Sequence, residues 1–118
     1  MSYTAMHKYA RISPRKVRAL ADLVRGKFAD EALDILRFQP HRGARMLEKV
    51  IKSALGNAEH QQASGIDDLV VVDARIDPGP MVKRHRPRAR GMAFGIKRRM
   101  SHIKVALAAS AVGDNGAE

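Results

Sequence analysis

Three segments in the first half of the chain repeat apolar residues every three to four positions, the period of an amphipathic α-helix. The first begins at Ser13–Pro14, because serine can cap free backbone amides and proline fits the first helical turn. It stops at Gly26, a residue typical of helix ends. The second, EALDILRF, has Asp30 as its expected cap and is closed off by Pro40.

The third segment carries the clearest helical pattern, which Gly65 limits at its far end. Its apolar residues form one continuous stripe that is expected to face the core: Leu47, Val50, Ile51, Ala54, Leu55 and Ala58. Its charged residues lie on the opposite side and are expected in solvent: Arg45, Glu48, Lys49, Lys52 and Glu59.

After Gly65 the apolar period changes to two, which is the period of a half-buried strand. In LVVVDARID, one apolar face is predicted to consist of Val70, Val72, Ala74 and Ile76. The two prolines of DPGP interrupt this strand, because each removes a backbone donor from the ladder. A weaker strand pattern covers AMHKYARI, residues 5–12.

The stretch MVKRHRPRARGMAFGIKRRM, residues 81–100, alternates in its first half without giving either face an apolar character. We expect two extended arms, about 80–89 and 93–102, around a turn near Arg90–Gly91. Ten strand residues at ~3.3 Å each would project this turn roughly 30 Å. Past Ser101 the apolar positions change parity, which predicts a bulge or twist before the final strand of Ile103, Val105 and Leu107.

With 118 residues, the chain is long enough for one domain with a modest core. We expect a globular part over about 1–79 and 101–108 and an extended β-hairpin over about 80–100. A disordered tail is expected over about 109–118.

Composition narrows the classes of protein to consider. The chain has no cysteine, which excludes disulfides and thiolate metal sites and fits a reducing compartment. Its first residues, MSYTAMHKYARISP, lack the apolar core of a secretory leader, and runs such as LVVV are too short to span a membrane. We therefore expect a soluble protein that stays in the cytoplasm.

The net charge of +10 is concentrated in one third of the chain. Residues 78–113 hold nine basic side chains and no acidic one, whereas residues 1–77 hold 13 basic and 10 acidic side chains. Such concentration is typical of a surface that binds a polyanion. The alternative, a merely solvated charge run, is less favoured, because arginine outnumbers lysine here and arginine binds phosphate bidentately.

Two basic groups are the candidate binding residues. The hairpin group is Lys83, Arg84, Arg86, Arg88, Arg90, Lys97, Arg98 and Arg99. The second group lies at the start of the first helix, where unpaired amides favour an anion: Arg11, Arg15, Lys16 and Arg18. The alternative for the second group is a surface that is only kept soluble.

Catalysis has no candidate constellation in this sequence. The five histidines lack metal-ligand spacing, and neither HExxH nor a P-loop occurs. Two other functions remain to be tested. One is an architectural DNA-binding dimer that wedges Pro87 between base steps, and the other is an RNA-processing enzyme that uses His85 and His102.

The chain also resembles the L-twenty-two family of large-ribosomal-subunit proteins from about Ala5 to Leu107. The likeness lies in RISPRKVRALADLVRGK, EALDILRF, SALGNAEH and GPMVKRHRPRARG…KRRMSHIKV. The spacing of five residues in the last segment is the most specific part: Lys83, Arg88, Ala89, Gly91 and His102. Met92 and Gly95 depart from the family, which commonly has basic or polar residues there.

The resemblance implies an α+β fold with three helices on a small three-stranded antiparallel sheet and a long protruding β-hairpin. It implies a structural protein of the bacterial-type large subunit that binds 23S-type rRNA. From the residues themselves we expect no catalysis, no cofactor or metal and no homo-oligomer, because the chain shows no catalytic or metal-binding constellation and no obvious apolar dimer surface beyond what one core needs. Its globular part would lie near the polypeptide exit beside other ribosomal proteins. The hairpin tip would line the tunnel and meet the nascent polypeptide through Arg88, Ala89, Arg90, Gly91 and Met92.

Overall fold

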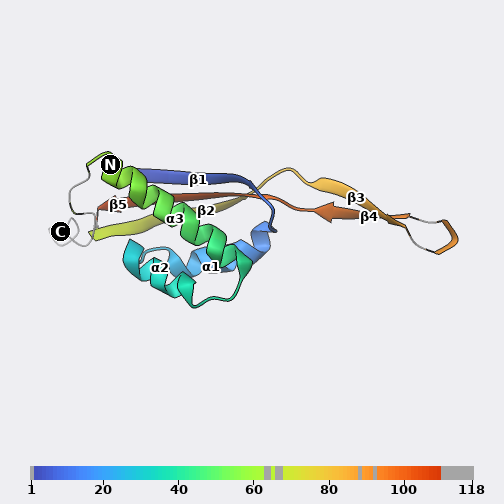
Figure 1. Ribbon diagram of the computed structural model, residues 1–118, viewed down its shortest axis with the longest axis horizontal. Helices are drawn as coiled ribbons and strands as arrows, with labels where there is room; N and C mark the ends of the chain where they lie inside the picture. Colours follow the sequence, from blue (N-terminus) through green and yellow to red (C-terminus); the bar gives the residue numbers. More distant parts are fainter. Residues whose placement is uncertain (1, 63–64, 66–67, 88, 92, 110–118) are drawn as a thin grey trace.

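A sheet covered by helices and a separate hairpin make up the molecule, as seen in a computed structural model that describes residues 2–62, 65, 68–87, 89–91 and 93–109 (Figure 1). Side chains are described outside residues 82–89 and 92–98. The helices are α1 (Pro14–Val24), α2 (Ala29–Arg37) and α3 (Arg42–His60). The strands are β1 (Ser2–Ala10), β2 (Leu69–Pro78), β3 (Val82–Pro87), β4 (Ala93–Arg98) and β5 (Ser101–Ala109). These elements confirm the predicted α+β class.

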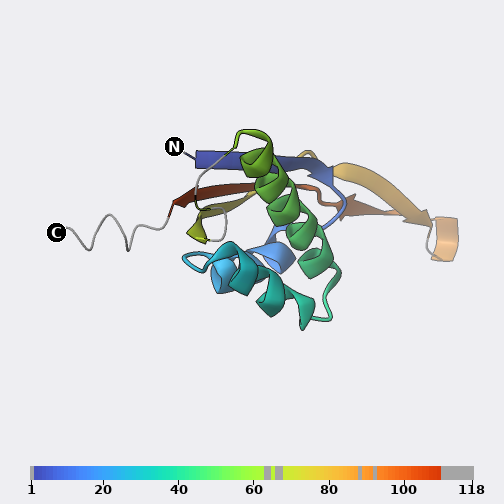
Figure 2. The ribbon, with the colours of Figure 1, turned by 60° about the vertical axis from the view of Figure 1, so that its left-hand side comes forward.

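The sheet places β5 between β1 and β2, and both neighbours are antiparallel to it. The helices cover one face, with α3 across β1 and β5 and α1 along β2 (Figure 2). As predicted, Ile103, Val105 and Leu107 are fully buried on that face. The core therefore forms between β5 and the apolar stripes of the helices.

The apolar stripe of α3 is confirmed, because the predicted residues from Leu47 to Ala58 are buried apart from Leu55, which is partly buried. Glu48 was expected in solvent but is only 9% exposed. Arg45, three residues earlier in α3, pairs with the Glu48 carboxylate at 2.9 Å. The ion pair explains how a carboxylate is tolerated there.

The predicted inward face of β2 is wrong at its start. Leu69 and Val71 are buried, whereas Val72 is 45% exposed. The register shifts between Val71 and Asp73, so one extra residue enters β2 opposite β5. Such a bulge reverses the alternation, which is why Ala74 and Ile76 are buried as predicted and Val72 is not.

The predicted helix caps are also wrong in detail. Ser13 occupies the N-cap of α1, but its side chain makes no capping hydrogen bond. In α2 the N-cap is Phe28, and Asp30 lies inside the first turn. There its carboxylate is near the positive end of the helix dipole, so an acidic residue still stabilises this terminus.

The outer edge of β2 is protected by α1 and the loop that follows it. The Arg18 guanidinium donates to the Ile76 carbonyl at 3.2 Å, and the Arg25 guanidinium donates to the Ala74 carbonyl at 2.6 Å. Val71 exchanges backbone hydrogen bonds with the loop, accepting from Gly26 and donating to Lys27. An exposed edge would invite pairing with another chain, and these contacts cover it.

One buried hydroxyl joins the start of β5 to the segment between β1 and α1. Ser101 is fully buried, and its Oγ donates to the Ile12 carbonyl at 2.6 Å. We expect Ser101→Ala to lower the free energy of unfolding by about 1–3 kcal/mol, because the carbonyl loses its buried donor. Urea denaturation measures the loss, with Ser53→Ala on the exposed side of α3 as the control. Equal stability of the two variants would contradict this role.

β3 and β4 form a hairpin that projects from the sheet (Figure 1). Six pairs join them, from Val82 opposite Arg98 to Pro87 opposite Ala93. The turn η2 (Ala89–Gly91) reverses the chain with positive φ at Arg90 and Gly91, 64° and 73°. The turn thus lies where the sequence placed it, although only glycine takes such φ values freely.

The hairpin gives the molecule its elongated shape, with extents of 69 × 25 × 25 Å. The radius of gyration is 17.7 Å, against about 13–14 Å for a compact domain of this length. Before the final strand, where the change of parity predicts a bulge or twist, β4 ends at Arg98 and β5 begins at Ser101, and the Gly79 amide donates to the Met100 carbonyl at 2.8 Å. Within the described residues, no helix is long and apolar enough to cross a bilayer. Residues 110–118 of the predicted disordered tail lie outside the described residues, and Ala109 ends β5.

Candidate nucleic-acid interface

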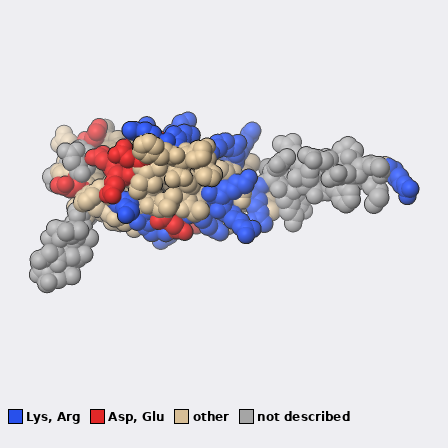
Figure 3. Space-filling view, turned by 90° about the horizontal axis from the view of Figure 1, so that it is seen from below, with Lys and Arg blue, Asp and Glu red and all other residues tan. Residues whose placement is uncertain are grey.

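Lys and Arg side chains gather at the end of the globular part from which the hairpin leaves (Figure 3). Asp and Glu side chains seen in the same view lie mainly toward the opposite end. The net charge of the chain is therefore arranged along its long axis. A polyanion would be attracted to the hairpin end.

The first predicted group lies at this end. Arg11 precedes α1, and Arg15, Lys16 and Arg18 lie in its first turns, all with exposed side chains. Arg18 differs from the others, because its guanidinium already binds the Ile76 carbonyl. Its charge still lies at the surface, but its orientation is set by β2.

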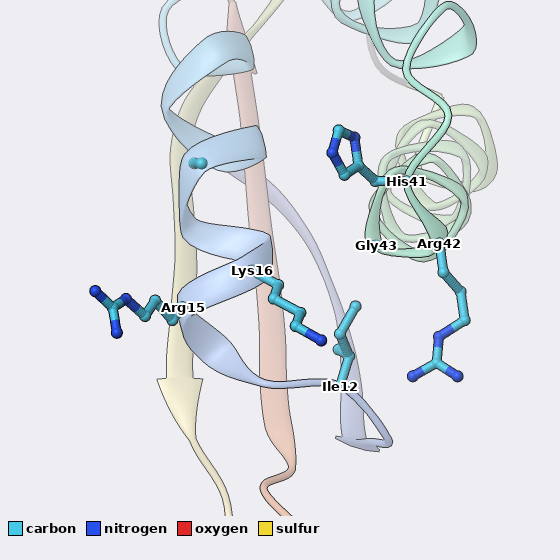
Figure 4. Close-up of a pocket in the computed structure, with 7 residues that line it drawn as sticks. Ile12, Arg15, Lys16, His41, Arg42 and Gly43 are labelled. Carbon is cyan, nitrogen blue, oxygen red and sulfur yellow. The ribbon is translucent and has the colours of Figure 1, made fainter.

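The start of α3 adds two residues that the sequence pattern did not single out, His41 and Arg42. Arg42 donates to the Arg11 carbonyl, so its guanidinium is fixed beside the segment that leads into α1. Together with α1 these residues border a cavity of about 640 Å³ (Figure 4). In the close-up, Lys16 and His41 point into the space between the two helices, and Arg15 points away from it.

A bulge in β1 lies near the point where the hairpin leaves the sheet. The register of β1 shifts between His7 and Ala10, and Tyr9 there has a φ of 59°. The Tyr9 amide donates to Nδ1 of His102 at 3.0 Å, and the two rings meet edge to face at 4.9 Å. Because Nδ1 accepts this bond, the proton of the neutral imidazole lies on Nε2. His102 therefore holds the bulge in place.

For most of the hairpin group, the structure gives the position of the backbone. Lys83, Arg84 and Arg86 belong to β3, and Lys97 and Arg98 belong to β4. Arg90 is exposed in the turn, and Arg99 is exposed between β4 and β5. Arg88 and Met92 lie outside the described residues.

The pair of histidines considered for catalysis does not converge. His85 lies opposite Gly95 in the hairpin, whereas His102 lies opposite Asp77 in the sheet. Seven residue steps separate Gly95 from His102, which corresponds to roughly 23 Å of extended chain. Among the described residues, no group of three or more His, Asp or Glu side chains is arranged to hold a metal ion.

Several other arginines serve the fold. Arg45 donates to the carbonyls of Leu36, Arg37 and Gln39 at the end of α2, and Arg25 binds β2 and Asp22. These contacts satisfy carbonyls that a helix end or a sheet edge leaves without a partner. The candidate interface is thus the hairpin with the adjoining ends of α1 and α3, and not every basic residue.

Comparison with known proteins gives consistent matches. A family model described as ribosomal protein L22p/L17e matches residues 5–108. The large ribosomal subunit protein uL22 of Rhodopirellula baltica is 66% identical over 110 residues, which cover 89% of this chain and 92% of that protein. The proteins of the same name from Caldicellulosiruptor saccharolyticus and Desulfotalea psychrophila are 53% and 51% identical. Those matches cover 88% and 91% of this chain and 85% and 97% of the two proteins.

Proposed function

Because the chain belongs to the ribosomal protein L22p/L17e family and is a structural constituent of the large ribosomal subunit, we propose that its basic hairpin and the adjoining helix ends bind large-subunit rRNA. The chain is not an enzyme. It associates with the ribosome, which in bacteria lies in the cytoplasm. The proposed rRNA-binding residues are Arg11, Arg15, Lys16, Arg18, Lys83, Arg84, Arg86, Arg88, Arg90, Lys97, Arg98 and Arg99.

The observation that carries the proposal is the isolation of a basic hairpin. β3 and β4 pair with each other and extend away from the sheet. A lone two-stranded hairpin is only marginally stable in water, and this one has eight Lys and Arg between residues 83 and 99 without an acid. Packing of rRNA around both sides would supply the missing contacts and neutralise the charge.

The same proposal assigns a separate role to each of two parts of the chain. Residues 1–79 and 101–108 form the globular anchor, and residues 80–100 form the arm of a single domain. The anchor lies near the polypeptide exit beside other ribosomal proteins, and the arm reaches inward to line the tunnel. The tip, residues 88–92, then meets the nascent polypeptide.

The rRNA proposal is tested by affinity at a fixed salt concentration. We expect the protein to bind a folded transcript of its large-subunit rRNA far more tightly than a DNA duplex of equal charge. The family membership already disfavours the architectural DNA-binding alternative. Equal affinity for both nucleic acids would overturn specific rRNA binding.

The tunnel proposal is tested at Gly91. Among the described residues, nothing lies within 4 Å of a Cβ added at this position, but the φ of 73° strains any β-branched residue. We expect Gly91→Val to distort the turn while the globular part keeps its stability, because the turn lies at the far end of the hairpin. Subunits should still assemble, but stalling of nascent chains or macrolide sensitivity should change. Normal stalling and a normal drug response would refute the tunnel contact and leave rRNA binding standing.

A further inference from the structure

The cavity between the first turns of α1 and α3 is large enough for a single nucleotide. Its volume is about 640 Å³, within the range of about 300–1,000 Å³ that is usual for small-ligand sites. The floor of the cavity forms where Gly43 lets the two helices approach closely. A Cβ at position 43 would lie 3.1 Å from Cδ1 of Ile12 and 3.3 Å from Cδ1 of Leu20. The cavity is thus set by close helix packing in the core.

Its rim is cationic. Lys16 points into the cavity, and Arg42 is fixed at its edge by the hydrogen bond to the Arg11 carbonyl (Figure 4). Neither α1 nor α3 has an acidic residue in its first turn, whereas α2 has Asp30 and Glu31. Cations near a helix N-terminus oppose the helix dipole. An external anion at this rim would offset that repulsion.

The interior of the cavity is suited to a planar, partly apolar group. Ile12, Ala19 and Gly43 line it with carbon atoms, and the imidazole of His41 points into it. Unpaired RNA bases commonly stack on histidine and arginine side chains, whereas a base inside a duplex cannot leave its stack without cost. The combination fits a base or ribose inside and a phosphate at the rim.

We propose that this cavity takes one unpaired nucleotide of the large-subunit rRNA, with its base or ribose against Ile12 and His41 and its phosphate at Lys16 and Arg42. This inference rests on the proposed rRNA binding and makes it specific at one position. The hairpin then supplies binding through many phosphates, and the cavity supplies recognition of a single flipped-out residue.

The test separates filling of the cavity from loss of charge. Ala19→Trp places an indole at the cavity without changing charge, and Val72→Trp on the exposed face of β2 is its matched control. Lys16→Gln removes one rim charge, and Lys52→Gln on the exposed side of α3 is its control. Each variant is titrated with the folded large-subunit rRNA transcript at several salt concentrations. Thermal melting verifies the fold, and 2′-hydroxyl acylation maps nucleotides in each complex.

We expect Ala19→Trp to weaken binding roughly 5- to 100-fold, the effect of losing one stacked base, with an unchanged salt dependence. One unpaired nucleotide that the original protein protects should become reactive in this complex. Lys16→Gln should instead reduce the slope of log affinity against log salt by about 0.7–0.9.

The inference is overturned if the original protein prefers rRNA while both cavity variants behave like their controls. It is also overturned if Ala19→Trp affects binding only when another ribosomal protein is present, since the cavity would then hold a protein segment. Failure of the original protein to prefer rRNA over DNA would instead count against the proposed function.

Discussion

Replacing Arg45 by alanine is expected to lower the free energy of unfolding by about 3 kcal/mol, because it leaves a buried carboxylate without its partner. Arg45 lies 2.9 Å from Oε1 of Glu48, whose side chain is only 11% exposed. Within the part of the chain that the structure describes, that oxygen has no hydrogen-bond partner, so the neighbouring charge is its main compensation. The same guanidinium donates to three carbonyls at the end of α2.

A matched arginine in α2 provides the control. Arg37 pairs with Asp34 at 3.5 Å, and both side chains are about two thirds exposed. We expect Arg37→Ala to cost less than about 1 kcal/mol, as for most surface ion pairs. The double variant Arg45→Ala with Glu48→Ala should regain part of the loss, because it removes the buried charge as well. Chemical denaturation that finds equal losses for Arg45→Ala and Arg37→Ala would contradict the role of the buried pair.

The pattern of apolar residues was sufficient to predict the elements that follow one period throughout. The stripe of α3 and the inward residues of β5 agree with the structure, because each element keeps its geometry from end to end. β2 does not, because its bulge between Val71 and Asp73 adds a residue and reverses the alternation. Nothing in the run LVVV distinguishes a bulged strand from a regular one, since all of its side chains are apolar.

The roles of individual arginines were harder to predict. Arg18, Arg25 and Arg45 bind backbone carbonyls of other elements. Those carbonyls come close to the arginines only when the helices pack. The spacing of residues along the sequence therefore does not predict these contacts. A basic residue on a polar helix face therefore has two possible roles, and tertiary contacts distinguish them.

The cavity residues also come together only through tertiary packing, which the sequence does not show. His41 and Arg42 are far from Lys16 in sequence, and the packing of α3 on α1 brings them together. The available signal was the glycine that follows Arg42, because Gly43 permits the close approach. The hairpin, by contrast, was predictable, since a long stretch without an apolar face cannot be buried in the core of the protein.

Replacing all eight basic residues of the hairpin by glutamine is expected to remove most of the salt-dependent affinity for rRNA. Those residues are Lys83, Arg84, Arg86, Arg88, Arg90, Lys97, Arg98 and Arg99. If each neutralises one phosphate, the slope of log affinity against log salt should fall by about 6 to 7. Titration of the large-subunit rRNA transcript over a range of salt concentrations measures this change.

The stability of the globular part should hardly change in the same variant, because β3 and β4 pair mainly with each other and extend away from the sheet. Urea denaturation should therefore give a free energy of unfolding within about 0.5 kcal/mol of the original protein, as for most surface substitutions. A second variant, with Arg37, Lys49 and Lys52 changed to glutamine, removes exposed charge from α2 and α3 outside the candidate interface. Its slope should stay close to that of the original protein. An equal fall in slope per removed charge in both variants would mean that net charge alone drives binding, and the hairpin would lose its assigned role as the rRNA-binding arm.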